Sequence, residues 1–310
     1  MRIAFAGTPV FAATVLAKLL NAQHKIVLVL TQPDRPSGRG LRPAGSAVKD
    51  FAVKQGLEVR QPVTLKDSEA LDFLAKARPE AIVTAAYGLI LPAPMLELAP
   101  HNAFNVHASL LPRWRGAAPI QRALLAGDQE TGITIIRMEA GLDTGPILAQ
   151  RSLSITDNDD AQSLHDRLAP MGGALMVSVL EMLAAGSARE EPQPGEGATY
   201  ARKIRDDEAV IDWSKPAAQI ERAVRAFRPA PGAQTGLRGQ RCKVWHARIA
   251  PGCGEPGTVI AIGTDAIRVA CGEGAVEITE LQRAGGRRLR AAEFLRGFAV
   301  APGERLAIPG

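Results

Sequence analysis

The sequence RIAFAGTPVFAATVLAKLLNAQHKIVLVL, residues 2–30, contains two short apolar runs separated by an amphipathic segment. The runs Arg2–Ala6 and Lys25–Leu30 have the length and composition of buried strands, and residues 10–20 have the apolar spacing of a helix. Two strands joined through a helix lie parallel in one sheet, because the helix carries the chain back across that sheet. The opening stretch therefore predicts a strand–helix–strand unit.

The same alternation continues to about residue 185 of this 310-residue chain. Further apolar runs are expected to be strands at 81–85, 103–106 and 132–137. Helical patterns are found at 48–55, 68–77, 118–125 and 161–184. Strands that alternate with helices predict an α/β fold, here a doubly wound, mainly parallel, Rossmann-like sheet. We assign it to residues 1–189, as the domain that carries the chemistry.

The pattern changes after Ala185. Residues 186–200 contain Gly, Pro and Glu without periodicity, so we expect a linker, placed at 190–205. In the remaining residues, 206–310, one predicted helix precedes several short strands separated by turn residues. The helix is expected at 217–226, and the strands at 243–249, 257–262, 266–270 and 275–281. Their regular spacing predicts an OB-like β-barrel.

Charge is distributed unevenly along the chain. Residues 201–310 contain 18 Lys and Arg against 12 Asp and Glu, a net charge of +6, whereas residues 1–200 contain 19 against 20. The basic excess therefore lies in the last third. A polyanion such as nucleic acid is a suitable partner for it, and a solvated surface with scattered charges is the alternative.

Signals for export or membrane insertion are missing from the sequence. The chain begins directly on its first predicted strand, so we expect no cleaved leader. No uninterrupted apolar run approaches the ~18 residues of a membrane-spanning helix. The three cysteines, Cys242, Cys253 and Cys271, are odd in number and lack C-x-x-C spacing, so they indicate neither disulfides nor a zinc site. We expect a protein of the reducing cytoplasm.

The first strand–helix turn does not have the sequence of a dinucleotide site. Residues 7–12, GTPVFA, follow a strand and open a helix, but Pro9 replaces the second glycine of G-x-G-x-x-G. P-loop, zinc-protease and nucleophile-elbow motifs are missing as well. The topology still favours a ligand beyond the carboxyl ends of the strands.

Two polar residues, Asn105 and His107, lie at the end of a predicted strand. Because side chains alternate along a strand, both are expected on one face. An amide donor beside an imidazole can stabilise an oxyanion and handle a proton. The alternative is that both merely satisfy hydrogen bonds at the strand end.

The segment GLDTG, residues 141–145, places Asp143 between two glycines. The glycines would let the backbone adopt left-handed conformations and approach a ligand closely. Asp143 could orient His107, keep it cationic or accept a proton through a water molecule. The alternative is an ordinary turn aspartate.

The long segment that contains these residues, NVHASLLPRWRGAAPIQRALLAGDQETGITI followed by MEAGLDTG, resembles the 10-formyltetrahydrofolate-dependent formyltransferases. The resemblance implies that Asn105, His107 and Asp143 are catalytic, that 10-formyltetrahydrofolate is the formyl donor, and that no metal is needed. It also implies a pterin site near residues 87–92 and 141–143. Further folate contacts are implied from Ser109, Leu110, Leu111 and Pro112.

Segments outside that core resemble the branch of the family that formylates methionyl initiator tRNA. They are AGTPVFA, TQPDRPSGRG, AAYGLILP and TYARKIRDDEAVIDW, together with the predicted barrel. The resemblance then implies that initiator methionyl-tRNA is the second substrate and that translation initiation is the role. We expect a monomer without membrane attachment.

Residues 33–49, PDRPSGRGLRPAGSAVK, contain three prolines, three glycines, four cations and one acid. This composition predicts an irregular loop with no packed element. A mobile, solvated loop is one interpretation, and the resemblance favours a loop that orders on the acceptor end of the tRNA. Contacts to tRNA are then expected from Arg35, Arg39 and Arg42.

On this interpretation the methionyl α-amine attacks the formyl carbon directly. A neutral amine is available near neutral pH, because the pKa of an α-amino group is roughly 8. His107, held protonated by Asp143, would bind the tetrahedral oxyanion together with Asn105. Two other functions remain open: formylation of an amino-sugar nucleotide by the same residues, and tRNA binding by an inactive enzyme fold.

Overall fold

The computed structural model describes residues 1–37 and 42–307, and the chain divides into two compact units. The α/β unit comprises Met1–Pro119, Glu130–Ser154 and His165–Arg202. The barrel unit comprises Ile120–Gln129, Ile155–Leu164 and Lys203–Gly310. The two short segments 120–129 and 155–164 therefore belong to the same compact unit as the C-terminal third of the chain.

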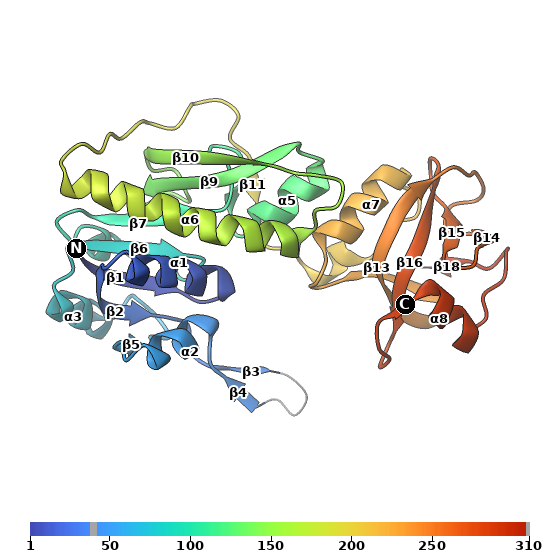
Figure 1. Ribbon diagram of the computed structural model, residues 1–310, viewed down its shortest axis with the longest axis horizontal. Coiled ribbons are helices and arrows are strands. Elements are labelled where there is room, and N and C mark those ends of the chain that lie inside the picture. Colours follow the sequence, from blue (N-terminus) through green and yellow to red (C-terminus); the bar gives the residue numbers. More distant parts are fainter. Residues whose placement is uncertain (38–41, 308–310) are drawn as a thin grey trace. The chain divides into compact units, whose positions relative to one another are not determined.

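Seven strands form the sheet of the α/β unit, in the order β10-β9-β7-β6-β1-β2-β5 (Figure 1). The strands are β1 (Arg2–Gly7), β2 (Lys25–Leu30), β5 (Val59–Arg60), β6 (Ala81–Ala85), β7 (Ala103–His107), β9 (Glu130–Arg137) and β10 (Ile147–Ser154). The neighbours among β7, β6, β1, β2 and β5 are parallel, whereas β9 is antiparallel to both β7 and β10. The sheet is therefore mainly parallel, as predicted.

Helices cover both faces of this sheet. They are α1 (Val10–Asn21), α2 (Ala47–Lys54), α3 (Ser68–Ala77), α4 (Ala93–Leu96) and α6 (Ala161–Ala184). Ala4 and Ala103 share a buried cluster with residues of α3 and α4. Val106 alternates with these positions and contacts α6, which lies beside α1 on the other face (Figure 1). The doubly wound arrangement is confirmed, and it places Asn105 and His107 on the same face as Ala103.

α6 packs closely because two of its residues lack a side chain. A Cβ at Gly172 would lie 2.7 Å from Cγ1 of Val106, and one at Gly173 would lie 2.7 Å from Cβ of Lys18. By length and hydropathy alone, α6 is the one described helix that could cross a membrane. Asp166, Arg167 and Ser178 interrupt its apolar residues, so it contains no uninterrupted apolar run of that length. The helix contributes to the core, where Leu168 is fully buried.

The barrel unit contains a curled antiparallel sheet in the order β14-β15-β16-β13-β12-β18, with β17 paired to β16. The strands are β12 (Ala233–Leu237), β13 (Gln240–Ala250), β14 (Val259–Ile262), β15 (Ile267–Ala270), β16 (Ala275–Arg283), β17 (Leu289–Arg290) and β18 (Leu306–Ala307). The two edges meet, because Thr258 forms a bridge with Arg305 and the amide of Leu306 donates to the carbonyl of Gly257 at 2.8 Å. The predicted barrel-like C-terminal sheet is confirmed.

Three helices and a short turn complete the barrel unit. They are α5 (Pro119–Ala126), α7 (Ala217–Ala226), α8 (Ala291–Gly297) and the 3₁₀ turn η1 (Asp206–Ala209). Ile220 of α7 and Phe294 of α8 pack into the interior of the sheet, and Leu125 of α5 packs against the same core. The core of the barrel unit therefore combines residues of the C-terminal third with Leu125 of α5, which comes much earlier in the chain.

The segment 33–49 contains ordered elements, so the prediction of an irregular loop was wrong in part. A hairpin of β3 (Arg35–Ser37) and β4 (Arg42–Ala44) occupies its middle, and Lys49 lies in α2. Pro36 and Pro43 lie directly opposite each other. Proline is tolerated there because each strand of a two-stranded ribbon is an edge strand, where a missing N–H need not break a ladder.

Residues 186–202 run along the α/β unit. Glu191 forms a bridge with Ile147, and β11 (Tyr200–Ala201) pairs in parallel with β8 (Arg115–Gly116). The amide of Arg115 donates to the carbonyl of Thr199 at 2.9 Å. This stretch is therefore hydrogen-bonded to the segment that follows β7.

Candidate active site

The three side chains predicted to be catalytic lie together in the α/β unit. Asn105 and His107 come from β7, and Asp143 comes from the loop between β9 and β10. Asn105 Nδ2 donates to Asp143 Oδ1 at 3.1 Å, and His107 Nδ1 lies 3.6 Å from Asp143 Oδ2. We call these three residues the Asp143 cluster. The carboxylate joins the amide and the imidazole.

The amide of Asn105 has a defined orientation. Thr84 Oγ1 of β6 donates to Asn105 Oδ1 at 2.8 Å, while Asn105 Nδ2 donates to the Asp143 carboxylate. An ionised carboxylate only accepts, so the nitrogen must face Asp143. One of the two amide hydrogens is used in this way. The second is available to a ligand, which is the donor that an oxyanion requires.

His107 is only 4% exposed, and both of its ring nitrogens face acceptors. Nε2 donates to the carbonyl of Trp114 at 2.8 Å, because a carbonyl can only accept. The 3.6 Å between Nδ1 and the Asp143 carboxylate is too long for a hydrogen bond. Nδ1 is therefore the ring atom that is not committed to a short hydrogen bond in this arrangement.

Asp143 is held by the backbone as well as by Asn105. Its φ of 51° lies in the left-handed region, and the amide of Gly116 donates to its Oδ2 at 2.8 Å. The expectation that the flanking glycines adopt this conformation was wrong, since the positive φ falls on the aspartate itself. Gly145 serves another purpose: a Cβ there would lie 1.8 Å from the carbonyl oxygen of Arg137. The turn closes only because this residue has no side chain.

The residues expected to contact folate form a tight turn after β7. Ser109 is fully buried, and its Oγ donates to the carbonyl of Arg113 at 2.6 Å. Leu111 is buried as well, and its amide donates to Thr134 Oγ1 at 3.1 Å. Leu110 and Pro112 are half-buried. The Ser109 side chain is therefore used inside the turn, and the half-buried pair offers the accessible surface.

One buried polar atom in this region has no partner within the described residues. The hydroxyl of Tyr87 makes no hydrogen bond, although the residue is only 4% exposed. Burial raises the pKa of Tyr87 well above its ordinary value, so the hydroxyl keeps its proton. A buried donor without a partner is costly, and a bound ligand would satisfy it. No group of three or more His, Cys, Asp or Glu side chains suited to a metal occurs in residues 1–37 and 42–307.

The three arginines expected to contact tRNA are placed only in part. Arg35 is exposed on β3 and donates to Gln32 Oε1 at 2.7 Å. Arg42 begins β4. Arg39 lies outside the described residues.

Four residues near the cluster were not predicted. Thr84 lies near the end of the strand predicted at 81–85 and pairs in register with Asn105, so its polar character was an available signal. Gly116 and Trp114 act through backbone atoms, which residue types do not reveal. Gln193 donates to the carbonyl of Asp143 from fifty residues away, and nothing local in the sequence marks it.

Comparison with known proteins agrees with this arrangement. The family described as formyl transferase matches residues 1–180, and the one described as formyl transferase, C-terminal domain, matches residues 203–299. The chain therefore belongs to the formyl transferase family, and the resemblance seen in the sequence is confirmed.

Individual relatives show which members of the formyl transferase family are similar to this chain. A protein of Dechloromonas aromatica named methionyl-tRNA formyltransferase is 53% identical over 309 residues, which cover 100% of each chain. One of the same name from Aromatoleum aromaticum is 52% identical, over 98% of this chain and 96% of its own. The crystal structure of HypX from Aquifex aeolicus in complex with tetrahydrofolic acid shares the fold, with a TM-score of 0.65 and 18% identity over 95% of this chain and 47% of that one.

Proposed function

We propose that this chain transfers the formyl group of 10-formyltetrahydrofolate to the α-amino group of methionyl initiator tRNA, for use in translation initiation. Two relatives named methionyl-tRNA formyltransferase are 53% and 52% identical to this chain over 100% and 98% of its length. One observation supports the chemistry most directly: the Asp143 carboxylate accepts a hydrogen bond from Asn105 and lies 3.6 Å from Nδ1 of His107.

In the proposed reaction the amine nitrogen forms a bond to the formyl carbon, and the bond from that carbon to the folate nitrogen then breaks. The free amide hydrogen of Asn105 stabilises the tetrahedral oxyanion. His107, protonated on both nitrogens, keeps one N–H on Trp114 and presents the other between Asp143 and the substrate. The amine proton leaves through Asp143, His107 or a water molecule, and a proton reaches the folate nitrogen by the same groups.

The cosubstrate site is proposed beside this cluster. Leu110 and Pro112 supply half-buried apolar surface, with Ser109 and Leu111 holding the turn from inside. The pterin is assigned to the segments 87–92 and 141–143. Each presents a large exposed apolar side chain, Ile90 at 89% and Leu142 at 59% exposure, and Tyr87 adds an unpartnered buried hydroxyl. Apolar surface with few placed polar groups is the usual composition of a ligand site.

We assign the chemistry to residues 1–189 and tRNA binding to residues 206–310, joined by 190–205. Arg241, Arg283 and Arg287 of the barrel unit are exposed, and no carboxylate among the described residues pairs with them. Arg241 and Arg283 lie on the adjacent strands β13 and β16, where the amide of Ala284 donates to the carbonyl of Arg241. We call the three the barrel arginine group. Uncompensated cations of this kind bind phosphates through counterion release.

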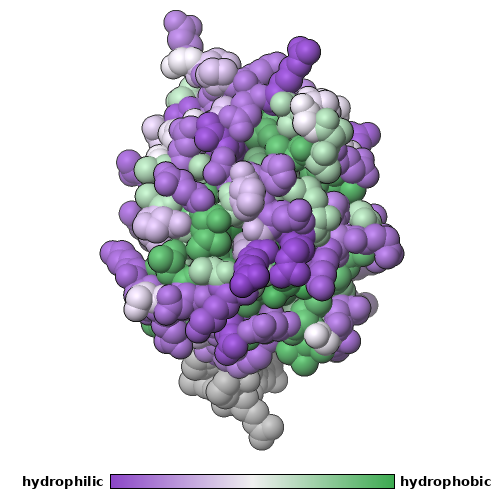
Figure 2. Space-filling model, turned by 90° about the vertical axis from the view of Figure 1, so that its left-hand side faces the viewer, coloured by the Kyte–Doolittle hydropathy of each residue, from purple (hydrophilic) through white to green (hydrophobic). Residues whose placement is uncertain are grey.

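Discrimination of the acceptor end is assigned to Arg35, Arg39 and Arg42 of the segment 33–49. The exposure of Arg35 on the two-stranded ribbon of β3 and β4 supports this assignment. A monomer in the cytoplasm is proposed as the working state. On the face shown in Figure 2, hydrophobic residues form small patches separated by hydrophilic ones, without one broad apolar surface.

The test is a transfer assay with labelled formyl donor and three acceptors. Methionyl initiator tRNA should be formylated, whereas the same tRNA without its amino acid should not. An amino-sugar nucleotide serves as the third acceptor, since it would react at the same cluster. Transfer to the amino sugar and none to methionyl-tRNA would overturn the proposed function.

A further inference from the structure

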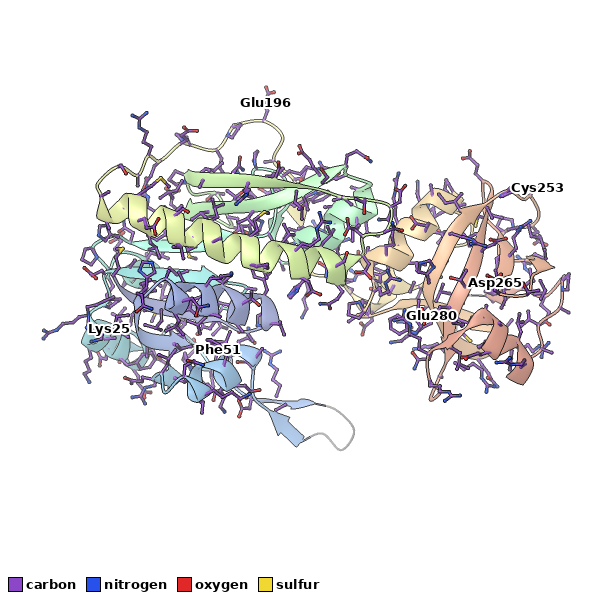
Figure 3. All side chains as sticks on the ribbon, in the orientation of Figure 1. Lys25, Phe51, Glu196, Cys253, Asp265 and Glu280 are labelled. Atoms are coloured by element: carbon purple, nitrogen blue, oxygen red, sulfur yellow. The ribbon has the colours of Figure 1, made fainter. Side chains whose placement is uncertain are left out.

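The segment between α6 and β11 is largely exposed. Within residues 189–200, Gln193 and Thr199 are half-buried and the other residues are exposed. Glu196 lies on the outermost part of the segment and points away from the sheet (Figure 3). Beneath the segment is a cavity of about 500 Å³, lined among others by Arg115, Thr144 and Gln193. Hydrogen bonds rather than apolar packing therefore hold this segment in place.

The side-chain amide of Gln193 makes all four hydrogen bonds of which it is capable. Its Nε2 donates to the carbonyl of Asp143 at 2.7 Å and to that of Gly145 at 2.8 Å. Its Oε1 accepts from Nε of Arg115 at 3.1 Å and from Nη2 at 2.7 Å. One side chain thus joins the loop that carries Asp143 to the segment that follows β7.

Both of the joined segments set the position of the Asp143 carboxylate. Asp143 itself has a left-handed backbone, which few residues adopt without support from their surroundings. Arg115 lies between Trp114, whose carbonyl accepts from His107, and Gly116, whose amide donates to Asp143. A shift of either segment would therefore change the 3.6 Å between His107 Nδ1 and Asp143 Oδ2.

The residues around Gln193 restrict the backbone conformation at this position. Pro192 and Pro194 flank it, and a residue before proline is confined to extended conformations. Six residues further on, Thr199 Oγ1 accepts from the amide of Trp114 at 2.9 Å. Gln193 and Thr199, on either side of the exposed Glu196, thus both bind the segment that follows β7.

We propose that Gln193 is a positioning residue for formyl transfer: it holds the Asp143 loop against Arg115 and thereby sets the geometry of the Asp143 cluster. This inference rests on the proposed function, since it assigns Asp143 to the reaction. It adds to the reaction a residue from a stretch whose composition predicts only a linker.

The variants Gln193→Leu and Gln193→Glu test it. Both lose the two bonds donated to the carbonyls, while glutamate can still accept from Arg115. We expect kcat to fall about tenfold or more in each, since a displacement of about 1 Å can cost ~100-fold in rate. The KM for methionyl-tRNA should stay within about twofold, because its binding is assigned to residues 206–310 and to the segment 33–49. Glu196→Ala, on the same segment, is the matched control and should behave as wild type.

A double-mutant cycle separates positioning from general stability. In an Asp143→Asn background, Gln193→Leu should cause little further loss, because it acts through the same carboxylate. An equal loss of kcat in both backgrounds would overturn the proposal, as would wild-type kcat in both Gln193 variants.

A second readout does not depend on the acceptor. The ring ¹H and ¹⁵N resonances of His107 should move in Gln193→Leu and stay in place in Glu196→Ala. Unmoved resonances would overturn the positioning role even if transfer to methionyl-tRNA is observed. Shifted resonances with no transfer to any amine would instead refute the proposed function and leave the positioning role standing.

Discussion

The Asp143 cluster and the barrel arginine group differ in the burial and the partners of their polar side chains. In the cluster, each side chain is at least partly buried and is hydrogen-bonded within the chain. In the barrel arginine group, Arg241, Arg283 and Arg287 are exposed and lack carboxylate partners among the described residues. Reaction chemistry requires groups held in advance at fixed distances, whereas binding of a polyanion requires charge that the protein has not already neutralised.

The barrel unit itself contains both kinds of arginine. Arg248 and Arg268 each donate to Glu277 on β16, at 2.7 Å and 2.6 Å. These paired arginines hold neighbouring strands, and the carboxylate of Glu277 offsets part of their charge. The difference between paired and unpaired arginines predicts which of them contribute to tRNA binding.

The largest expected effect is that of His107→Ala. Removal of a donor to the oxyanion costs about a hundredfold or more in kcat. The affinity for tRNA should stay within about twofold, because the variant leaves the barrel arginine group unchanged. His101→Ala is the control, since the one hydrogen bond that His101 donates to a described residue comes from its backbone amide, to the carbonyl of Glu80. A kcat above about a tenth of wild type would rule out the assigned role.

The next effect in size is that of Gly145→Ala. The added Cβ would lie 1.8 Å from the carbonyl of Arg137, so the loop that carries Asp143 must move. A shift of about 1 Å in a reacting group can lower the rate by ~100-fold. Gly297→Ala is the matched control, because a Cβ there meets no atom within 4 Å. Steady-state kinetics check it, and equal activity of the two variants would show that the loop position is not critical.

Replacement of Arg241, Arg283 and Arg287 by glutamine should weaken tRNA binding roughly tenfold. The slope of log Kd against log salt should become shallower by about 2 to 3, since each lost phosphate contact accounts for ~0.7 to 0.9. Arg305→Gln, which removes a cation paired with Glu255, should change the slope far less. Binding titrations at several salt concentrations measure both values, and an unchanged slope in the triple variant would assign tRNA binding to another surface.

The smallest expected effect is a change in thermal stability when Glu277, the partner of Arg248 and Arg268, is replaced. Hydrogen bonds from Arg268 and Arg248 hold the pKa of Glu277 below its usual range. A lowered pKa in the folded state stabilises it above the unfolded pKa of about 4.3, and this stability is lost as the pH falls through the folded value. Glu277→Gln should therefore lower Tm at pH 7 by no more than about 2–4 °C and have less effect near pH 3. Thermal unfolding at both pH values checks it, and a larger effect at low pH would contradict it.

Much of the fold could be predicted because apolar periodicity determines burial. β2, β6, α3, α6 and α7 begin and end at the predicted residues. β10 was not predicted, since as an edge strand it is largely exposed and lacks an apolar run. The hairpin of β3 and β4 was not predicted, because a composition rich in proline, glycine and charge indicates an irregular loop. Proline prevents pairing only in central strands, and this ribbon has none.

The site could be predicted less completely than the fold. Asn105, His107 and Asp143 form part of a long, distinctive segment, and residue type indicates their chemistry. The contributions of Trp114 and Gly116 come from backbone atoms, and that of Gln193 depends on tertiary proximity across fifty residues. Neither kind of contact leaves a periodic or local pattern in the sequence.

The division of roles between the Asp143 cluster and the barrel arginine group is tested most directly by single-turnover transfer with enzyme in excess over methionyl-tRNA. Asp143→Asn should lower the rate at saturating enzyme about a hundredfold or more and leave the half-saturating concentration unchanged. The triple arginine variant should raise that concentration roughly tenfold and reach the wild-type rate at saturation. Loss of the saturating rate in the arginine variant, or of binding in Asp143→Asn, would contradict this separation of chemistry from tRNA binding.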